Sequence, residues 1–135
     1  MESGTKKHSE IEDFLISGVC LEDQYRQERL ELLFNQCKII GIEESFESEK
    51  FKGRTDVRFV KNGFNYIGDF KSKFKRPYLE HYLQLICYKI HFGCDKICII
   101  DIRDFQMHEL SLENENEYTE IIYNLINIYN LKQKL

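Results

Sequence analysis

The sequence predicts an α/β domain with a mixed central β-sheet flanked by α-helices. Segments with helical periodicity alternate with short runs that have the alternating or continuously apolar pattern of strands. The predicted order is helix, helix, three strands, helix, two strands, helix, which suits a sheet covered by helices. A length of 135 residues and a hydrophobic content of 42% suit a single core, so we assign residues 1–135 to one domain.

The first two predicted elements are helices. Residues 5–16 form the first, and a Ser-Gly pair ends it. Its apolar side chains at helical spacing are Ile11, Phe14 and Leu15. Residues 22–37 form the second helix, in which charged residues surround one shared face. The members of that face are Tyr25, Arg29, Leu32 and Leu33.

Three predicted strands follow as a meander. Residues 38–46 are rich in isoleucine, and residues 54–60 alternate between two faces, with Asp56 on the face opposite Val57. Asn62-Gly63 is typical of a tight hairpin turn. Residues 65–72 therefore return as the partner strand.

The second half of the chain predicts a helix, two strands and a final helix. Pro77 suits the first turn of the helix, and Gly93 ends it. Its predicted core stripe consists of Leu79, Leu83, Ile86 and Ile90. Residues 96–103 form an apolar strand that suits a buried position, and residues 105–112 form another. Residues 116–132 form an amphipathic helix whose apolar side chains are Tyr118, Ile121, Ile122, Leu125, Ile128 and Tyr129.

Charge and cysteine content narrow the class of protein. A net charge of -4 does not by itself indicate nucleic-acid binding. Lys71, Lys73, Lys75 and Arg76 nevertheless form a local basic cluster, which either contacts phosphate or is a solvated loop. No apolar run suits a membrane span or a signal peptide, so we expect no membrane partner. An odd number of cysteines without a CxxC pair favours reduced thiols in an intracellular compartment.

The tripeptide Asp69-Phe70-Lys71 is the strongest candidate for chemistry. Side chains at i and i+2 of a strand point the same way, so Asp69 and Lys71 face one site while Phe70 points into the core. The predicted hairpin brings Asp56 alongside Asp69. Two converging carboxylates suit Mg²⁺ or Mn²⁺, and a nearby lysine can orient an attacking water. The alternative is an exposed ion pair on a sheet.

Five segments, in order, resemble the motifs of RecB-like exonucleases in the PD-(D/E)xK nuclease superfamily. They are Gly4-Thr-Lys-Lys-His8-Ser-Glu-Ile-Glu12, Ile42-Glu43, Gly53-Arg-Thr-Asp56, Asp69-Phe-Lys71 and Gln84-Leu-Ile-Cys-Tyr88. The chain is similar to mitochondrial genome maintenance exonucleases and related phage exonucleases over about residues 4–110. The resemblance implies a restriction-endonuclease-like fold and hydrolysis of DNA, preferably single strands or ends, with Mg²⁺ or Mn²⁺.

The resemblance also implies a role for each matched residue. Asp56 would be the bridging metal ligand and Asp69 the other acidic ligand. His8 would ligate a second metal or line the site, and the Phe70 backbone carbonyl would also bind metal. Lys71 would position the attacking water.

Other residues are implied as supporting groups. Gln84 and Tyr88 lie on one helix face and would contact the nucleic-acid backbone or support Lys71. Glu12 and Glu43 are additional candidates for the site. The basic segment of Lys73, Lys75 and Arg76 is expected to hold a flanking phosphate.

Several of these residues have a simpler interpretation. His8 can be an ordinary surface or core histidine that pairs with Glu12 on the helix. Glu43 and Glu44 are adjacent, so they should point to opposite faces of a strand, and one of them can be merely solvated. By default, Gln84 and Tyr88 are partly buried polar residues near the sheet.

The sequence departs from larger relatives in two ways. The cysteines lack the arrangement that holds an iron–sulfur cluster in some RecB-like nucleases, so we expect no cluster. The chain starts almost at the first motif helix, so we expect it to lack the upstream segment that threads single strands. Two other classes stay open: a catalytically weak nucleic-acid-binding module of a larger DNA-processing complex, and a structural subunit whose carboxylates are only ion-paired.

Overall fold

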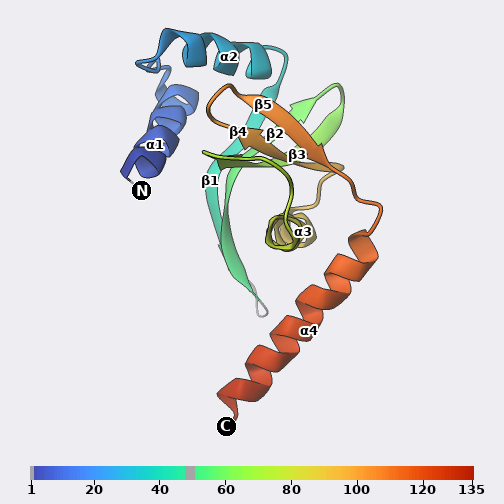
Figure 1. Cartoon of the computed structure of the whole chain (residues 1–135). Coiled ribbons are helices and arrows are strands. Elements are labelled where there is room, and N and C mark those ends of the chain that lie inside the picture. Colours follow the sequence, from blue (N-terminus) through green and yellow to red (C-terminus); the bar gives the residue numbers. More distant parts are fainter. Residues whose placement is uncertain (1, 48–50) are drawn as a thin grey trace.

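The computed structural model describes residues 2–47 and 51–135, with the backbone alone for residues 2–5 (Figure 1). Gly4 and Thr5 of the first motif therefore lie outside the described side chains. Within this part of the chain, four helices surround a five-stranded sheet. The elements are α1 (Glu2–Ser17), α2 (Gln24–Phe34), β1 (Lys38–Glu47), β2 (Lys52–Lys61), β3 (Phe64–Lys71), α3 (Leu79–Phe92), β4 (Lys96–Asp101), β5 (Gln106–Leu110) and α4 (Glu115–Gln133).

The sheet is mixed and has the strand order β1-β2-β3-β4-β5. β1, β2 and β3 pair antiparallel as a meander, β3 and β4 pair parallel, and β5 pairs antiparallel with β4. The parallel pair needs a crossover, and α3 supplies it. The predicted α/β class with a mixed central sheet is confirmed, and the element order matches the prediction.

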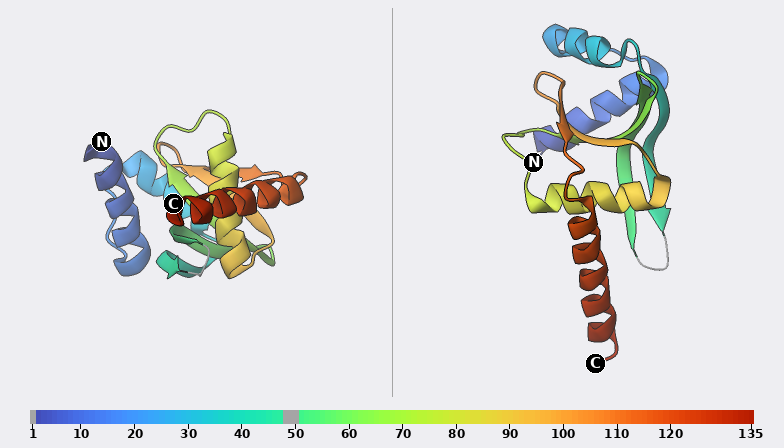
Figure 2. Two further views of the ribbon diagram at one scale, coloured as in Figure 1. Left: turned by 90° about the horizontal axis from the view of Figure 1, so that it is seen from below. Right: turned by 90° about the vertical axis from the view of Figure 1, so that its right-hand side faces the viewer.

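Two apolar clusters place the helices on opposite faces of the sheet. The cluster under α1 and α2 includes Ile11, Leu30 and Phe34, and it meets Phe59 and Phe70 of the sheet. The cluster under α3 and α4 meets the alternate sheet residues, including Ile67 and Ile99. Successive strand residues therefore serve different cores. Figure 2 shows α3 lying against the sheet and α4 crossing α3 before it extends away.

The hairpin between β2 and β3 follows the prediction closely. Asn62 and Gly63 both have positive φ, 52° and 81°, which is the backbone of the turn that Asn-Gly favours. Lys61 pairs with Phe64 across it. This turn sets the register of β2 against β3, so it also fixes which side chains share a face near the middle of the sheet.

The predicted inner face of α2 was wrong. Tyr25 and Leu32 are 59% and 69% exposed, whereas Leu30 and Phe34 are buried together with Arg26 and Gln27. The polar pair can be buried because each side chain has at least one hydrogen-bond partner, although Arg26 Nη2 has none among the described residues. Arg26 Nε donates to the Ile102 carbonyl at 2.8 Å, and Gln27 Oε1 accepts from the Leu21 N–H at 2.7 Å. Apolar spacing alone gives no sign of such partners.

The predicted stripe of α3 was also partly wrong. Leu79 and Ile90 are 51% and 38% exposed, and the buried residues of the helix are Leu85, Ile86 and Tyr88. Pro77 precedes α3 and is not in its first turn, because the helix begins after Tyr78. The Tyr78 N–H donates to His81 Nδ1 at 3.0 Å and so closes the helix start.

Half of the predicted apolar face of α4 is exposed. Ile122 is buried, but Leu125, Ile128 and Tyr129 are 52%, 60% and 61% exposed. The helix packs on α3 near its start, where Tyr118 stacks on Tyr82 with ring centroids 4.6 Å apart, and Ile126 still packs against the cluster under α3. Among the described helices, none is long and apolar enough to cross a membrane.

Candidate functional site

The two predicted carboxylates meet on neighbouring strands. Val57 of β2 lies opposite Gly68 of β3, so the next residues along, Asp56 and Asp69, are brought together. Their side chains share a hydrogen bond. Asp56 also accepts a hydrogen bond from the Phe70 backbone N–H at 2.8 Å. The register of the hairpin thus brings Asp56 and Asp69 together, as we predicted from the sequence.

Lys71 lies on the same face as Asp69, as the alternation of β3 predicted. Lys71 Nζ is 2.9 Å from Asp69 Oδ2, and the side chains are 35% and 8% exposed. The intervening Phe70 is buried in the opposite core. The Ile102 N–H donates to the Lys71 carbonyl at 2.9 Å, so the lysine backbone is held by the chain that follows β4. A buried carboxylate therefore lies beside an ammonium group that still reaches solvent.

The surroundings of the Asp56 carboxyl disfavour its ionised form. Burial raises its pKa to about 9, and both the hydrogen bond and the charge of Asp69 act in the same direction. The Phe70 N–H opposes this rise, and Glu43 adds to it. Crowded carboxylates with too little positive charge nearby tend to hold a proton. Added positive charge, such as that of a divalent cation, would favour their ionised forms.

The first helix brings two more predicted residues to this place. The ring of His8 lies edge-on to Phe70 with centroids 6.2 Å apart, and His8 forms a hydrogen bond with the Phe70 backbone. Burial lowers the His8 pKa, and the charge of Asp69 opposes the change. Glu12, one turn further along α1, is close enough to raise the Glu43 pKa. His8 therefore borders the carboxylate pair, and Glu12 lies near Glu43.

Glu43 enters from β1 by an irregular backbone. Its φ of 52° interrupts the strand alternation, next to a register shift between Ile39 and Gly41. Both side chains reach arginines of β2: Glu43 Oε2 is 2.6 Å from Arg54 Nε, and Glu44 Oε2 is 3.0 Å from Arg58 Nη2. The charge of Glu12 on α1 acts on Glu43, whereas Arg58 lies over the Phe92 ring of α3. That Glu43 and Glu44 point to opposite faces stays a prediction.

Burial raises the Glu43 pKa, while the neighbouring arginine lowers it. The charges of Glu12 and Asp69 raise it further. Glu43 thus belongs to the same electrostatic group as the central carboxylates. Arg54 was not among the predicted site residues, although it alternates with Asp56 on β2 and could have been found from that period.

Tyr88 of the α3 motif packs against the β2 motif at Gly53. Gln84 Nε2 donates to the Tyr88 hydroxyl at 2.7 Å, as neighbours on a helix face can. Tyr88 is buried, whereas Gln84 is exposed. A Cβ on Gly53 would lie 2.9 Å from Tyr88 Cε1 and 3.1 Å from the Phe46 ring. Glycine is therefore required at the start of the Gly53-Arg-Thr-Asp56 motif so that Tyr88 can pack against β2.

Tyr88 is also linked to the carboxylates by charge. Burial raises its pKa, and the charges of Asp69 and Asp56 raise it further, against the effect of Gln84. The hydroxyl is therefore neutral at physiological pH and can donate a hydrogen bond. Tyr88 is buried, as a simple packing role would require. The carboxylates that act on it nevertheless place it near the predicted site.

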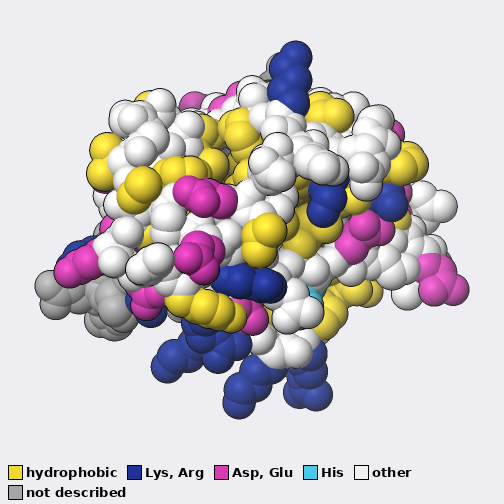
Figure 3. Space-filling view, turned by 90° about the horizontal axis from the view of Figure 1, so that it is seen from above, with side chains coloured by type: hydrophobic (Ala, Val, Ile, Leu, Met, Phe, Trp, Pro, Cys, Tyr) yellow, Lys and Arg dark blue, Asp and Glu magenta, His cyan; other side chains and the backbone are white. Residues whose placement is uncertain are grey.

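The basic segment follows β3 directly. Lys73, Lys75 and Arg76 are exposed, whereas Phe74 between them is buried and lies 4.8 Å, centroid to centroid, from His108. In Figure 3, lysine and arginine side chains gather along one edge of the molecule. The segment thus presents cations to solvent while one aromatic side chain attaches it to the sheet.

Arg103, which was not among the predicted site residues, contacts the backbone of the basic segment at Phe74. Its Nη2 is 2.6 Å from Asp101 Oδ2 and donates to the Phe74 carbonyl at 3.3 Å. Asp101 lies opposite Lys71 in the register of β3 and β4. A salt bridge two residues apart in sequence is common, so nothing in the sequence connects Arg103 to the loop after β3.

The donor chemistry fits a divalent cation, although the carboxylates have protein partners. Among the described residues, no three His, Cys, Asp or Glu side chains form a group that could hold a metal ion as they stand. Asp69 instead pairs with Lys71, and Glu43 pairs with Arg54. The residues nevertheless fit, because Asp56 and Asp69 meet on paired strands with the His8 ring near them, and oxygen and imidazole donors suit such an ion.

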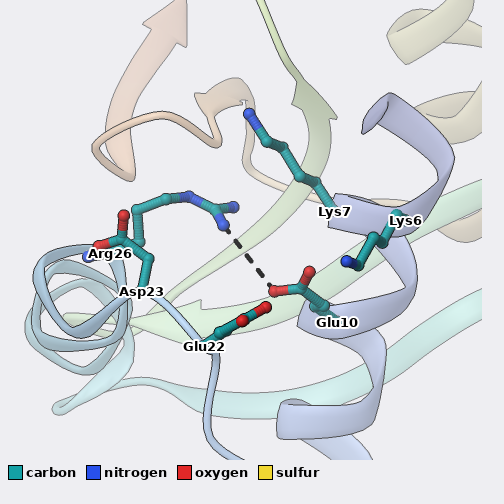
Figure 4. Close-up of a pocket in the computed structure, with 6 residues that line it drawn as sticks. All are labelled: Lys6, Lys7, Glu10, Glu22, Asp23 and Arg26. Atoms are coloured by element: carbon teal, nitrogen blue, oxygen red, sulfur yellow. Dashed lines mark hydrogen bonds and ion pairs between the residues drawn. The ribbon is translucent and has the colours of Figure 1, made fainter. Parts of the chain in front are cut away.

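A separate pocket of about 510 Å³ lies between α1 and α2 (Figure 4). It contains none of the predicted site residues. Its lining residues are Lys6, Lys7, Glu10, Glu22, Asp23 and Arg26. Because cationic and anionic side chains are balanced in this lining, it offers no net charge for an ion, and Arg26 is already 4.0 Å from Glu10.

Compared with models of protein families and with curated proteins, the sequence matches none of them. The resemblance to RecB-like nucleases therefore stands on the five motifs. Two of the five segments supply the carboxylate pair of Asp56 and Asp69, and the other three contribute His8, Glu43 and Tyr88 near that pair.

Proposed function

We propose that this protein is a metal-dependent nuclease that hydrolyses phosphodiester bonds in DNA. The observation that carries the proposal is the junction of Asp56 and Asp69 on paired strands, with the raised Asp56 pKa and Lys71 2.9 Å from Asp69. An ion pair that served only stability would not need a second carboxylate pressed against it. The fold class and the motif order support the same proposal.

The residues around the pair would hold Mg²⁺ or Mn²⁺. Asp56 and Asp69 would supply carboxylate oxygens, and the Phe70 carbonyl and His8 lie beside them. The ion would supply positive charge to the phosphate oxygens and would lower the pKa of the attacking water. A neutral His8 suits this role, because burial lowers its pKa and leaves a ring nitrogen free to bind.

The remaining residues would position the reactants. Once positive charge compensates Asp69, the Lys71 ammonium can donate to the attacking water or to a phosphate oxygen. Tyr88 can donate from its hydroxyl toward the backbone of the substrate, with Gln84 holding it in place. Glu43 and Glu12 add negative charge at the border of the site and can carry outer-sphere waters.

The exposed basic segment supports a nucleic-acid substrate. Lys73, Lys75 and Arg76 follow Lys71 within one loop, so a strand that passes over the carboxylates would lie along them. Phosphate contacts of this kind weaken as salt rises. Preference for single strands or for DNA ends follows from the resemblance to exonucleases.

A second function is favoured by the ion pairs. Lys71 neutralises Asp69 and Arg54 neutralises Glu43 without any metal. A nucleic-acid-binding module with weak turnover would keep the basic segment and need no ion. Such a module would retain its affinity in chelator and would not cleave.

Cleavage of end-labelled DNA tests the proposal. Single-stranded and double-stranded DNA, and RNA in parallel, would be incubated with Mn²⁺ or Mg²⁺, with EDTA and Lys71→Ala as negative controls. Lys38→Ala, an exposed lysine at the start of β1, is the matched control. We expect metal-dependent cleavage by the wild type and Lys38→Ala alone. Binding without cleavage in every metal condition would instead support the binding module.

A further inference from the structure

The end of α4, from residue 127 on, leaves the body of the protein. Every residue from 127 to 135 is exposed, and Figure 1 shows the helix running away from the sheet to the C-terminus. The first half is attached to α3, where Lys89 Nζ is 2.8 Å from Glu115 Oε2 and Ile122 is buried. A helix in water normally keeps its apolar side chains covered. Here the last residues of the helix, from 127 on, are not covered by the rest of the described chain.

An apolar stripe runs along α4 into this exposed part. Ile121, Leu125, Ile128 and Tyr129 recur at spacings of four, three and one along α4, so they share one side of the helix. Leu125, Ile128 and Tyr129 are each more than half exposed. Apolar residues at alternating spacings of three and four are the pattern by which one helix packs against another. We call these four residues the α4 stripe.

Charges beside the stripe indicate what covers it. Glu117 lies near one end of α4 and Lys132 near the other, both on the side of the stripe. Leu125 stands midway between them. If a second α4 crossed antiparallel at Leu125, each Glu117 would come beside the Lys132 of the other copy. A parallel arrangement would instead set like charges side by side.

We propose that the α4 stripe is the interface of a homodimer, formed by two α4 helices packed antiparallel about Leu125. The surface is self-complementary, so a two-fold arrangement closes with both copies satisfied. The stripes meet at the centre and the two Glu117–Lys132 pairs flank them. This inference does not depend on the proposed nuclease activity, because no residue of the carboxylate site takes part.

Sedimentation equilibrium of the full chain over a range of concentrations tests the interface. The wild type is expected to show a concentration-dependent dimer. Ile128→Lys places a charge in the stripe and is expected to raise the dimer dissociation constant at least about tenfold. Leu32→Lys changes an equally exposed leucine on α2 and is the matched control, with no change expected. Circular dichroism confirms that each variant is folded.

A charge exchange tests the antiparallel orientation. Glu117→Lys and Lys132→Glu each set like charges together across the interface, and each is expected to weaken the dimer several-fold. The double variant Glu117→Lys/Lys132→Glu restores opposite pairs and is expected to return to about the wild-type dissociation constant. A monomer at all concentrations would overturn the proposal and leave the stripe to a different protein partner. A dimer that survives Ile128→Lys, or a double variant no stronger than the singles, would overturn it as well.

Discussion

Asp56→Asn should stabilise the metal-free protein at alkaline pH. Burial and the adjacent Asp69 raise the folded-state pKa of Asp56 to about 9, from an ordinary value of 3.8. The folded protein therefore holds a proton that the unfolded chain releases. With a folded pKa above the unfolded one, the stability from this group is complete below about pH 4 and is lost as pH rises toward about pH 9. An asparagine keeps the hydrogen-bonding shape without the titration.

The size of the effect follows from the same linkage. Holding one proton at pH 8 on a group whose ordinary pKa is 3.8 costs up to about 6 kcal/mol. The pair shares its proton and is partly open to solvent, so we expect roughly 1–3 kcal/mol for Asp56→Asn. Urea unfolding in EDTA at pH 5 and pH 8 measures it. The variant should gain most at pH 8 and little at pH 5.

Asp101→Asn provides a control of opposite sign. Burial alone would raise the Asp101 pKa, but hydrogen bonds from Arg103 hold it below its usual range. Its stabilisation is therefore present above the ordinary pKa and is lost as pH falls, so Asp101→Asn should destabilise the protein at both pH values. If Asp56→Asn were no more stable than wild type at pH 8, the crowded-carboxylate account would be refuted.

Three further predictions follow from the site. Gly53→Ala would press a Cβ against Tyr88 and Phe46, so we expect a loss of about 1–3 kcal/mol in urea unfolding, and an unchanged stability would contradict that packing. Mn²⁺ affinity, measured by calorimetry, should rise up to about tenfold per unit between pH 6 and pH 8, because Asp56 must release its proton; a flat profile would contradict the raised pKa. Arg76→Ala should weaken DNA binding and reduce the slope of log K against log salt by about 1 in a fluorescence titration, and an unchanged slope would exclude a phosphate contact.

The central features could be predicted from sequence because they rest on local rules. Asn62-Gly63 fixes a hairpin, and strand alternation then decides that Asp69 and Lys71 share a face while Phe70 does not. The same rules placed Asp56 on the neighbouring strand. The order of helices and strands followed from periodicity, and the α/β class followed from that order.

What could not be predicted depends on partners distant in sequence. Arg26 is buried because the Ile102 carbonyl accepts its hydrogen bond, and nothing near residue 26 indicates that contact. Glu43 has a positive φ, which is rare for glutamate and which the sequence does not indicate. Arg103 acts on the loop after β3 through the Phe74 carbonyl. In each case tertiary contacts outweigh the local pattern.

The apolar face of α4 illustrates a different limit. Periodicity correctly predicts an amphipathic helix, but it does not say what covers the apolar side. Ile122 is covered by this chain, whereas Leu125 and Ile128 are not. A sequence pattern reports that a surface needs a partner, and the structure decides whether the same chain provides one.

The most direct test of the account is single-turnover cleavage of end-labelled single-stranded DNA, with Mn²⁺ titrated into wild type, Asp56→Asn and Asp13→Asn. Asp13 is an exposed carboxylate on α1 and serves as the matched control. We predict that wild type and Asp13→Asn cleave in proportion to bound Mn²⁺, and that Asp56→Asn loses at least about a hundredfold in rate at every concentration. Cleavage by Asp56→Asn at the wild-type rate would contradict the claim that this carboxylate pair is the catalytic centre.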